Sequence, residues 1–454
     1  MMWNEKIKVD KKYNKEDVLY EIFRRLDDRS ISYVVIHGRE RIRKGNISDV
    51  DVAFERDPKI ALVPLLKEMQ QQGYFRIINI LHYDVPNCYY MILAIEGKKK
   101  IVEYLHIDCL CDETGINRYI LKSSDLLRRR ALDGDIYAPR PEIEGIYLLI
   151  KKTKKKTLDK DSASRVKDLM SKSPNESISE SKRIVNGKFA SIVKNLLQGK
   201  YDEDVNALYS DVSSSLKGWY YTHPFYGLRR GALQAFRLIN RMRRPSGVFI
   251  VFLGPDGSGK STIANEVLKI LKGGFRKTWH FHWRPGILPS LGRKKRLSSN
   301  KNTTNAPVPS TTFKYGVGLS LARFFYYFAD FALGSVKITL ARMQTTLVVS
   351  ERYYYDHFVH PERYAFKIPK WVFRIGLVAI RKPDLVIVLE NDPRIIWERK
   401  KELPLEEITR QLDLYKKFAK SERGFCVRTD DSVDTISKNI AVEVLKICER
   451  KIVV

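Results

Sequence analysis

The spacing of hydrophobic residues divides the chain into three regions. In the first, residues 1–138, a helical pattern with apolar residues on one face covers Lys15–Asp27. Alternating or β-branched runs then predict strands at Tyr33–His37, Val50–Phe54, Asn87–Ile95 and Lys100–Leu110. This mixture of helices and strands predicts an α+β domain.

The second region, residues 139–244, is polar and compatible with helices, and it carries a basic run at 151–156. The serine-rich segment Ser171–Ser181 predicts a loop. The segment Trp219–Arg244 mixes aromatic residues with arginines. This composition favours a helix packed on a neighbouring domain, and a helix lying on a membrane surface is the alternative. We therefore expect a helical connecting region.

The third region, residues 245–454, alternates short apolar runs with helical patterns, which is typical of a doubly wound parallel sheet in an α/β fold. Leu319–Met343 is apolar almost all round, as in a helix buried between elements or at a dimer interface. Gly292–Thr312 is a basic, polar insert that we expect to be mobile. The predicted strands are Val248–Leu253, Thr278–Arg284, Thr346–Ser350, Asp384–Glu390 and Phe425–Thr429.

The net charge of +29 indicates anionic partners, such as nucleotides, nucleic acid, acidic glycans or a membrane surface. A solvated basic surface is the alternative, and the chain has no aromatic-plus-basic RNA motif. The five cysteines are scattered and do not suggest a disulfide framework. The N-terminus has no apolar signal core, and no stretch reaches the length of a membrane span. These features predict a cytoplasmic protein.

One motif carries specific chemistry. The buried run Val248–Leu253 leads directly into Gly254-x-x-x-x-Gly259-Lys260-Ser261, the pattern of a phosphate-binding loop. The glycines let backbone N–H groups face phosphate oxygens, at the positive end of the helix that follows. Lys260 reaches the β- and γ-phosphates, and the Ser261 hydroxyl is a ligand for Mg²⁺. The motif predicts ATP and Mg²⁺ binding; a glycine-rich turn that binds nothing is the alternative. The residues assigned to the loop are Gly254, Pro255, Asp256, Gly257, Ser258, Gly259, Lys260, Ser261 and Thr262.

Further candidate residues follow other predicted strands. Strict alternation places His280, His282 and Arg284 on one strand face, where Arg284 is positioned to bind an anionic acceptor group. Two such histidines more often line a wall than bind metal. Glu351 ends a buried strand, where it holds Mg²⁺ through water or orients an acceptor hydroxyl. Arg352 follows and is suited to an acceptor phosphate, unless both residues form structural salt bridges.

The basic sequence around Arg399 lies on a predicted helical hairpin, where mobile cations could close over the phosphates. A solvated helix face is the alternative for each of these residues.

These motifs resemble the thymidylate kinase family of nucleoside monophosphate kinases over about residues 245–454. HWRPG and RYYYD are similar to the thymidylate kinase-like proteins of bacterial surface-polysaccharide loci. The resemblance implies that Glu351, Arg352 and Tyr353 bind metal and acceptor phosphate, and that Arg284 also binds that phosphate. Glu351 replaces the usual aspartate, and the basic insert is a second departure from the family.

The first region has its own motif, in which His37-Gly38-Arg39 precedes Asp49-Val50-Asp51. It resembles the nucleotidyltransferase superfamily, although Arg39 replaces the usual Ser or Gly. Two-residue periodicity places Asp49 and Asp51 on one strand face. With Asp108 as a third acid, these carboxylates could hold two divalent ions. Two aspartates on an exposed strand face are the alternative.

The sequence thus predicts a bifunctional enzyme: a kinase acting on a phosphorylated nucleoside or sugar-type acceptor, fused to a nucleotidyltransferase-like domain. Such an enzyme would suit the synthesis of an activated donor for glycan assembly. Two alternatives stay open. One is an ATP-switched protein that binds nucleic acid or an anionic surface, and the other is a kinase with a non-catalytic N-terminal module. Peripheral membrane contact and a homodimer are compatible with each.

Overall fold

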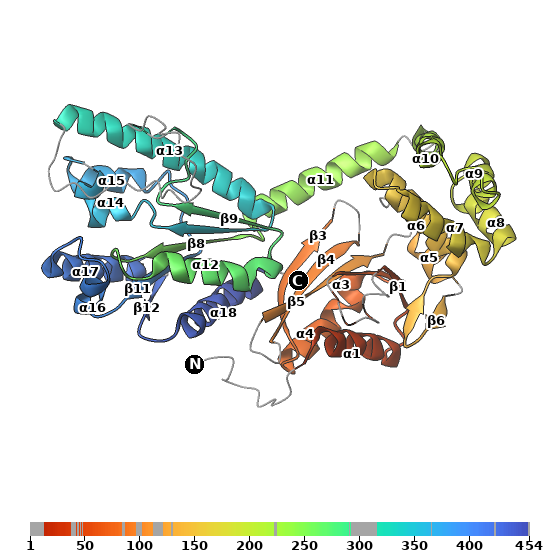
Figure 1. The fold of residues 1–454 in the computed structure, drawn as a ribbon, viewed down its shortest axis with the longest axis horizontal. Helices are drawn as coiled ribbons and strands as arrows, with labels where there is room; N and C mark the ends of the chain where they lie inside the picture. Colours follow the sequence, from red (N-terminus) through yellow and green to blue (C-terminus); the bar gives the residue numbers. More distant parts are fainter. Residues whose placement is uncertain are drawn as a thin grey trace. The chain divides into compact units, whose positions relative to one another are not determined.

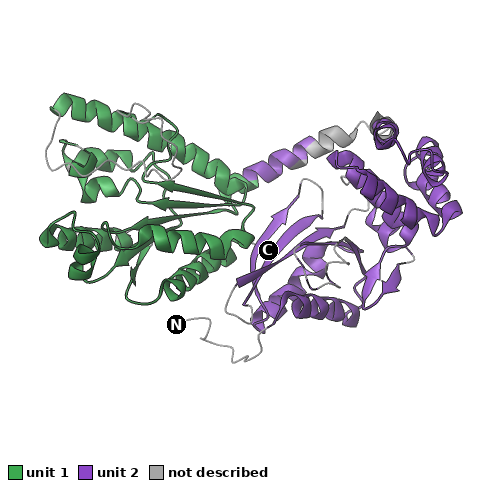
Figure 2. Cartoon of the chain, in the orientation of Figure 1, with its two compact units in different colours: residues 1–3, 240–453 green, residues 4–239, 454 purple. Residues whose placement is uncertain are grey.

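A computed structural model describes most of the chain and divides it into two compact units, formed mainly by residues 4–239 and 240–453 (Figure 2). The predicted insert Gly292–Thr312 and the Gly38-Arg39 turn lie outside the described residues. The residues that the structure describes are 13–37, 42, 45, 47, 49–83, 87–96, 102–111, 121–128, 130–221, 225–289, 291, 316–364, 366–421 and 424–452.

The N-terminal unit contains a five-stranded mixed sheet with the order β1-β2-β5-β4-β3 (Figure 1). β2 and β5 are parallel, and the other neighbouring pairs are antiparallel. The four predicted strands and the first helix are confirmed, and β3 is a strand that the sequence analysis missed. The elements are α1 (Lys15–Asp28), β1 (Tyr33–His37), β2 (Asp49–Phe54), α3 (Pro58–Ala61), α4 (Val63–Gln71), β3 (Arg76–His82), β4 (Tyr89–Glu96) and β5 (Val102–Leu110).

The helices of the middle region share a hydrophobic core with this sheet. Val34 and Ala53, on β1 and β2, belong to the same buried cluster as Ile146 and Phe189. The elements are α5 (Ser123–Leu127), β6 (Ala131–Asp133), β7 (Ile136–Ala138), α6 (Pro141–Lys155), α7 (Lys160–Ser171), α8 (Pro174–Ile184), α9 (Gly187–Leu197) and α10 (Val205–Tyr221). The middle region and the first sheet therefore form one packed body.

The loop predicted at Ser171–Ser181 is wrong. Pro174 starts α8 at its first turn, a position that tolerates proline because the missing N–H has no partner there. Ser177 is buried and donates its hydroxyl hydrogen bond to the Met170 carbonyl at 3.0 Å. Small serine side chains let this helix pack closely, so serine content did not indicate a loop here.

α11 (Phe225–Arg243) is a helix, as predicted, but it has no packed face among the described side chains. From Gln234 to Arg244 every side chain is at least partly exposed. Packing of this segment on a neighbouring domain stays a prediction. Among the described residues, no helix combines the length and apolar character needed to cross a membrane.

The C-terminal unit contains a sheet of five strands, all parallel, in the order β12-β11-β8-β10-β9 (Figure 1). The predicted parallel α/β sheet is confirmed. Its elements are β8 (Val248–Leu253), α12 (Lys260–Leu271), η1 (Lys272–Gly274), β9 (Lys277–His282), α13 (Val317–Met343), β10 (Thr346–Glu351), α14 (Asp356–Val359), η2 (Pro361–Tyr364), α15 (Lys370–Gly376), β11 (Leu385–Glu390), α16 (Pro393–Arg399), α17 (Leu405–Ser421), β12 (Gly424–Arg428) and α18 (Val433–Lys451).

Helices cover both faces of this sheet, with α13 on one side and α12 with α18 on the other (Figure 1). β8 is the central strand, and all six of its residues are buried. Phe249, Val251 and Leu253 share a core with Phe331 and Tyr327 of α13. The carboxyl end of β8 consequently lies in the middle of the sheet edge, where the glycine-rich loop begins.

Two expectations for this unit need correction. β9 ends at His282, two residues before the predicted end, because Trp283 adopts a positive φ of 65°. The alternation of side-chain direction along the strand stops there. Arg284 therefore lies in the following turn and does not continue the histidine face. α13 buries one face, and Val336 and Leu340 on its other face are exposed, so this helix is not buried between elements on all sides. The dimer-interface alternative stays a prediction.

Candidate functional site

The loop between β8 and α12 adopts backbone conformations that glycine favours. Gly254, Gly257 and Gly259 have φ values of 145°, 89° and 86°. A Cβ atom on Gly254 would lie 2.7 Å from the Leu389 carbonyl oxygen, and one on Gly257 would lie 2.9 Å from that of Ile396. Neighbouring backbone carbonyls thus leave no room for a side chain at Gly254 or Gly257. The first N–H groups of α12 follow directly, as anion binding requires.

Lys260 lies within this loop. Its Nζ donates hydrogen bonds to the carbonyls of Gly254 at 2.9 Å and Pro255 at 2.6 Å, and it lies 3.5 Å from the buried Ser258 hydroxyl. Burial, reinforced by the positive charge of Arg352, lowers the pKa of Lys260 to about 7. An anion in the loop would stabilise the ammonium form and raise that pKa.

Ser261 and Glu351 lie together although 90 residues separate them. The Ser261 hydroxyl donates to one carboxylate oxygen of Glu351, and His280 Nε2 lies 2.9 Å from the other. Burial opposes ionisation of Glu351, but the hydrogen bonds from His280 and Ser261 hold its pKa below the ordinary value. A hydroxyl beside an ionised carboxylate fits Mg²⁺, which prefers oxygen ligands. Thr262, the next residue, is exposed.

Arg352 is buried and connects the loop to the end of β10. Its Nη2 donates to the Asp256 carboxylate, and its Nη1 donates to Asp356 Oδ2 at 2.7 Å. Arg363 Nη1 binds the second oxygen of Asp256 at 2.6 Å. Although burial opposes the charge of Asp256, Arg352, Lys260 and Arg363 together hold its pKa well below the ordinary range. The loop carboxylate therefore fixes two guanidinium groups.

Sequence reasoning missed four members of this network, which are Asp356, Arg363, Tyr364 and Tyr415. Asp356 is fully buried and also accepts hydrogen bonds from the hydroxyls of Tyr364 and Tyr415. Its spacing of four residues from Arg352 is not a helical contact, because Arg352 has a positive φ of 64° and lies before α14. None of these residues therefore left a local helical signal.

Arg284 belongs to a separate ion pair. Its Nη1 lies 3.2 Å from Asp330 Oδ2 on α13 and donates to the Leu288 carbonyl at 2.9 Å. Tyr353 lies in the core, edge-on to Phe249, and its hydroxyl donates to the Arg381 carbonyl at 2.9 Å. Arg284 and Arg352 are thus held by different carboxylates, and the Tyr353 hydroxyl is engaged by the backbone.

Arg399 is exposed at the last residue of α16. This helix adjoins the loop, because a Cβ atom on Gly257 would lie 3.2 Å from Lys400 Cβ as well as close to Ile396. A cationic segment therefore begins beside the glycine turn. That these basic residues close over phosphates stays a prediction.

The N-terminal unit places its three acidic residues on two adjacent strands. Asp49 and Asp51 share one face of β2, and Asp51 pairs in register with Asp108 on β5. Burial raises the pKa of Asp108 to about 7, and the charges of Asp51 and Asp49 add to this effect. Tyr83 donates its hydroxyl hydrogen bond to Asp108 at 3.1 Å.

Lys151, on α6, is a member of this site that the sequence analysis treated only as part of a basic run. Its Nζ binds Asp51 Oδ2 at 2.6 Å, across 100 residues of sequence. The Tyr147 hydroxyl lies 3.5 Å from the same oxygen. The site therefore combines acids from the sheet with a cation from the helical region.

Neither site forms a complete metal-binding cage from protein ligands. In the part of the chain that the structure describes, no three His, Cys, Asp or Glu side chains are grouped so that they could hold a metal ion. Mg²⁺ is commonly bound by one or two carboxylates together with substrate phosphates. The oxygen donors in both sites fit that mode, in which the nucleotide supplies the remaining ligands.

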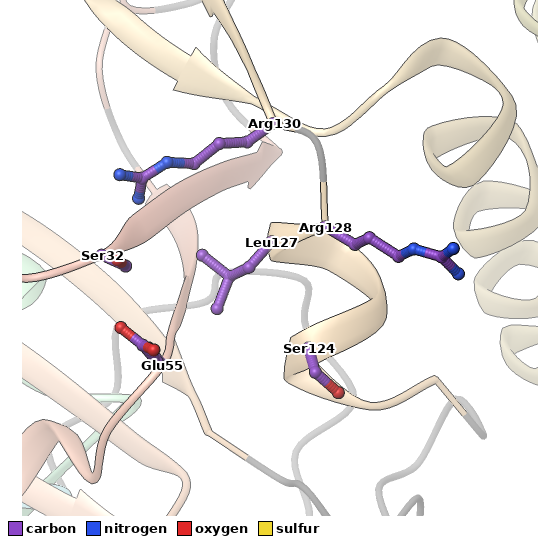
Figure 3. A pocket seen from close by; sticks show the side chains of 6 residues that line it. All are labelled: Ser32, Glu55, Ser124, Leu127, Arg128 and Arg130. Carbon is purple, nitrogen blue, oxygen red and sulfur yellow. The ribbon is translucent and has the colours of Figure 1, made fainter.

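A cavity of about 420 Å³ lies in the N-terminal unit, and Figure 3 shows the residues that line it. It is distinct from the acidic site. Ser32 precedes β1 and Glu55 follows β2, so the cavity lies where β1 begins and β2 ends. Asp51 pairs with His37 at the end of β1, which is the other end of this strand pair. Its lining residues are Ser32, Glu55, Ser124, Leu127, Arg128 and Arg130. Arg130 is held there by a hydrogen bond to the Tyr33 carbonyl at 2.8 Å.

Comparison of the chain with models of known protein families and with curated proteins gives no match.

Proposed function

We propose that the C-terminal unit is an ATP- and Mg²⁺-dependent phosphotransferase of the nucleoside monophosphate kinase type. The observation that carries the proposal is the loop from Gly254 to Ser261, with the Lys260 ammonium inside it and the Ser261 hydroxyl against Glu351. This combination supplies backbone amides, a cation and two oxygen donors at one sheet edge. Phosphoryl transfer depends mainly on such positioning and charge stabilisation.

Each residue has a role in this proposal. Lys260 neutralises the phosphate oxygens of ATP, and its buried position keeps the charge from being screened by water. Ser261 and Glu351 would hold Mg²⁺, which supplies charge neutralisation between the phosphates. Both Nη atoms of buried Arg352 are paired with carboxylates, the salt-bridge alternative of the sequence analysis, so an anionic acceptor would have to displace one of them. Arg399 is suited to closing over the phosphates. The acceptor class is a phosphorylated nucleoside or a phosphorylated sugar.

The test is ADP release in a screen of thymidylate, other nucleoside monophosphates and sugar phosphates. Lys260→Ala should abolish release with every acceptor. Lys269→Ala is the matched control, because Lys269 lies on the same helix, is exposed and pairs only across one turn with Glu266. Unchanged turnover in Lys260→Ala would refute the proposal.

A second activity is favoured by the N-terminal unit. We propose a nucleotidyltransferase, because Asp51 faces Asp108 on the adjacent strand and Lys151 brings a cation to the same carboxylate. Acids that bind divalent ions beside a cation that contacts phosphate are the components of nucleotidyl transfer. The proton that Asp108 holds near neutral pH would be released when divalent ions bind.

Transfer of label from nucleoside triphosphates labelled at the α-phosphate tests this second activity. Asp49→Ala/Asp51→Ala should abolish it, whereas the control pair of exposed acids, Asp28→Ala/Asp161→Ala, should not. Equal transfer by both double variants would overturn the assignment. Absence of transfer by the unmodified chain would favour a non-catalytic N-terminal module, and ATP-dependent binding of nucleic acid without turnover would favour the ATP-switched binding protein.

A further inference from the structure

α11 exposes a patch of large apolar side chains. Phe236, Leu238, Ile239 and Met242 have exposed fractions of 64%, 53%, 51% and 60%. They lie within two helical turns, and at 100° per residue they fall on one side of the helix. Single exposed apolar residues are ordinary on protein surfaces, but four on one helix side form a patch that indicates an interaction surface.

The opposite side of the same helix is basic. Arg237 and Arg241 project away from Ile239 and Met242 on the helical wheel. Arg243 ends the helix between Ile239 and Phe236 on the wheel, and Arg244 follows the helix. The surrounding sequence contains no acidic residue between residues 211 and 256. A helix with an apolar side, an arginine-rich side and no acids has the composition of helices that lie in a membrane interface.

We propose that residues 231–243 of α11, with Arg244 after it, bind the surface of an anionic lipid bilayer. The apolar side chains enter the boundary between headgroups and acyl chains, and the arginines contact lipid phosphates. Long arginine side chains can keep their guanidinium groups at the phosphate level while their methylene stems contact apolar surface. The proposal concerns a surface separate from both candidate active sites.

Charge complementarity selects this partner over two others. A second copy of the chain could cover the apolar side, but Arg237 and Arg241 project from the opposite side and would gain no anionic partner from it. Nucleic acid offers phosphates, but its backbone gives no apolar phase for Phe236, Ile239 and Met242. An anionic bilayer satisfies both sides of the helix together.

Vesicle flotation of the full chain tests the proposal, with vesicles of phosphatidylcholine alone or with about 30% phosphatidylglycerol, a charge density at which basic residues bind. Binding should require phosphatidylglycerol and should weaken in high salt. Arg237→Glu/Arg241→Glu should reduce the partition coefficient by at least about 25-fold, because each of the two lost positive charges contributes roughly 5-fold. Phe236→Ser/Ile239→Ser should also abolish flotation.

Two matched controls isolate the helix from bulk charge and general hydrophobicity. Lys182→Glu/Lys194→Glu changes the net charge equally on exposed positions of α8 and α9, and Leu333→Ser/Val336→Ser removes exposed apolar groups from α13. Both controls should float like the unmodified chain, and circular dichroism should show unchanged helix content in all variants.

Three flotation results would overturn the proposal: no flotation of the unmodified chain, equal loss in the control pairs, or full binding by both α11 variants. The proposal would also be overturned if the chain bound a single-stranded RNA more tightly than the vesicles and Phe236→Ser/Ile239→Ser kept that RNA binding. This result would assign the helix to nucleic acid.

Discussion

Asp356→Asn probes the network that holds Arg352 against the phosphate-binding loop. The substitution keeps the size of the side chain and removes its charge. Asp356 accepts from the Arg352 guanidinium and from the hydroxyls of Tyr364 and Tyr415, and none of its surface is exposed. An asparagine would turn an NH₂ group toward at least one of these three donors. A buried arginine would then keep only Asp256 as its ionic partner.

The expected loss follows from the geometry. Removing one partner of a buried ion pair costs about 3–5 kcal/mol. Because Arg352 retains Asp256, and because a tyrosine hydroxyl can rotate to accept from the new NH₂ group, we expect the lower end, about 3 kcal/mol. Tyr364→Phe removes a single hydrogen bond to the same carboxylate and should cost less, about 1.5 kcal/mol.

Hydrogen exchange measured by mass spectrometry resolves the effect within the C-terminal unit. Peptides from β8 and β10 should exchange about 100-fold faster in Asp356→Asn and about 10-fold faster in Tyr364→Phe, since 1.4 kcal/mol is a factor of ten. Peptides from β4, in the other unit, are the internal control and should not change. Exchange of β8 within threefold of the unmodified chain would refute the ion-pair reasoning.

Three further predictions concern the loop and the acidic site. Gly257→Ala places a Cβ atom 2.9 Å from the Ile396 carbonyl oxygen at a residue whose φ is 89°. The substitution should destabilise the unit by about 1–3 kcal/mol and weaken ATP binding measured by calorimetry. Unchanged ATP affinity would contradict the loop assignment. Carboxyl NMR should give Asp108 a pKa of about 7, raised from 3.8. Between pH 3.8 and about 7 the folded chain keeps a proton on Asp108 that the unfolded chain releases. The free energy of unfolding should therefore fall as pH rises through this range, by up to about 1.4 kcal/mol per pH unit. Asp108→Asn should remove this pH dependence. Lys151→Met should raise the pKa of Asp108 further, because the Lys151 ammonium lowers it; an unchanged or lower value would show that the two groups do not interact.

The sequence was most informative where local chemistry and sheet geometry coincide. β8 has the predicted bounds because a β-branched and aromatic run is bounded by glycine. The contact between Ser261 and Glu351 follows from the same logic. β8 and β10 are parallel neighbours, so the residues after their carboxyl ends meet at one sheet edge.

Other features depend on packing that no local pattern encodes. Trp283 interrupts β9 with a positive φ, although the alternation of residue types continues through Arg284. Lys151 reaches Asp51 from a helix 100 residues away, and Arg363 reaches Asp256 across 107 residues. Each contact is set by how helices dock on a sheet, and a single sequence reports the helices but not their docking.

The net charge of +29 is a weaker guide to partners than the local distribution of that charge. Buried arginines such as Arg352, Arg363 and Arg342 are matched by Asp256, Asp356 and Asp384, so they contribute nothing to an exposed basic surface. The excess must therefore lie in segments without acids, and α11 is one of them. Taken over the whole chain, the positive charge suggests a nucleotide or nucleic acid as the partner. At α11 the arginines accompany an exposed apolar side, and this combination indicates a lipid surface.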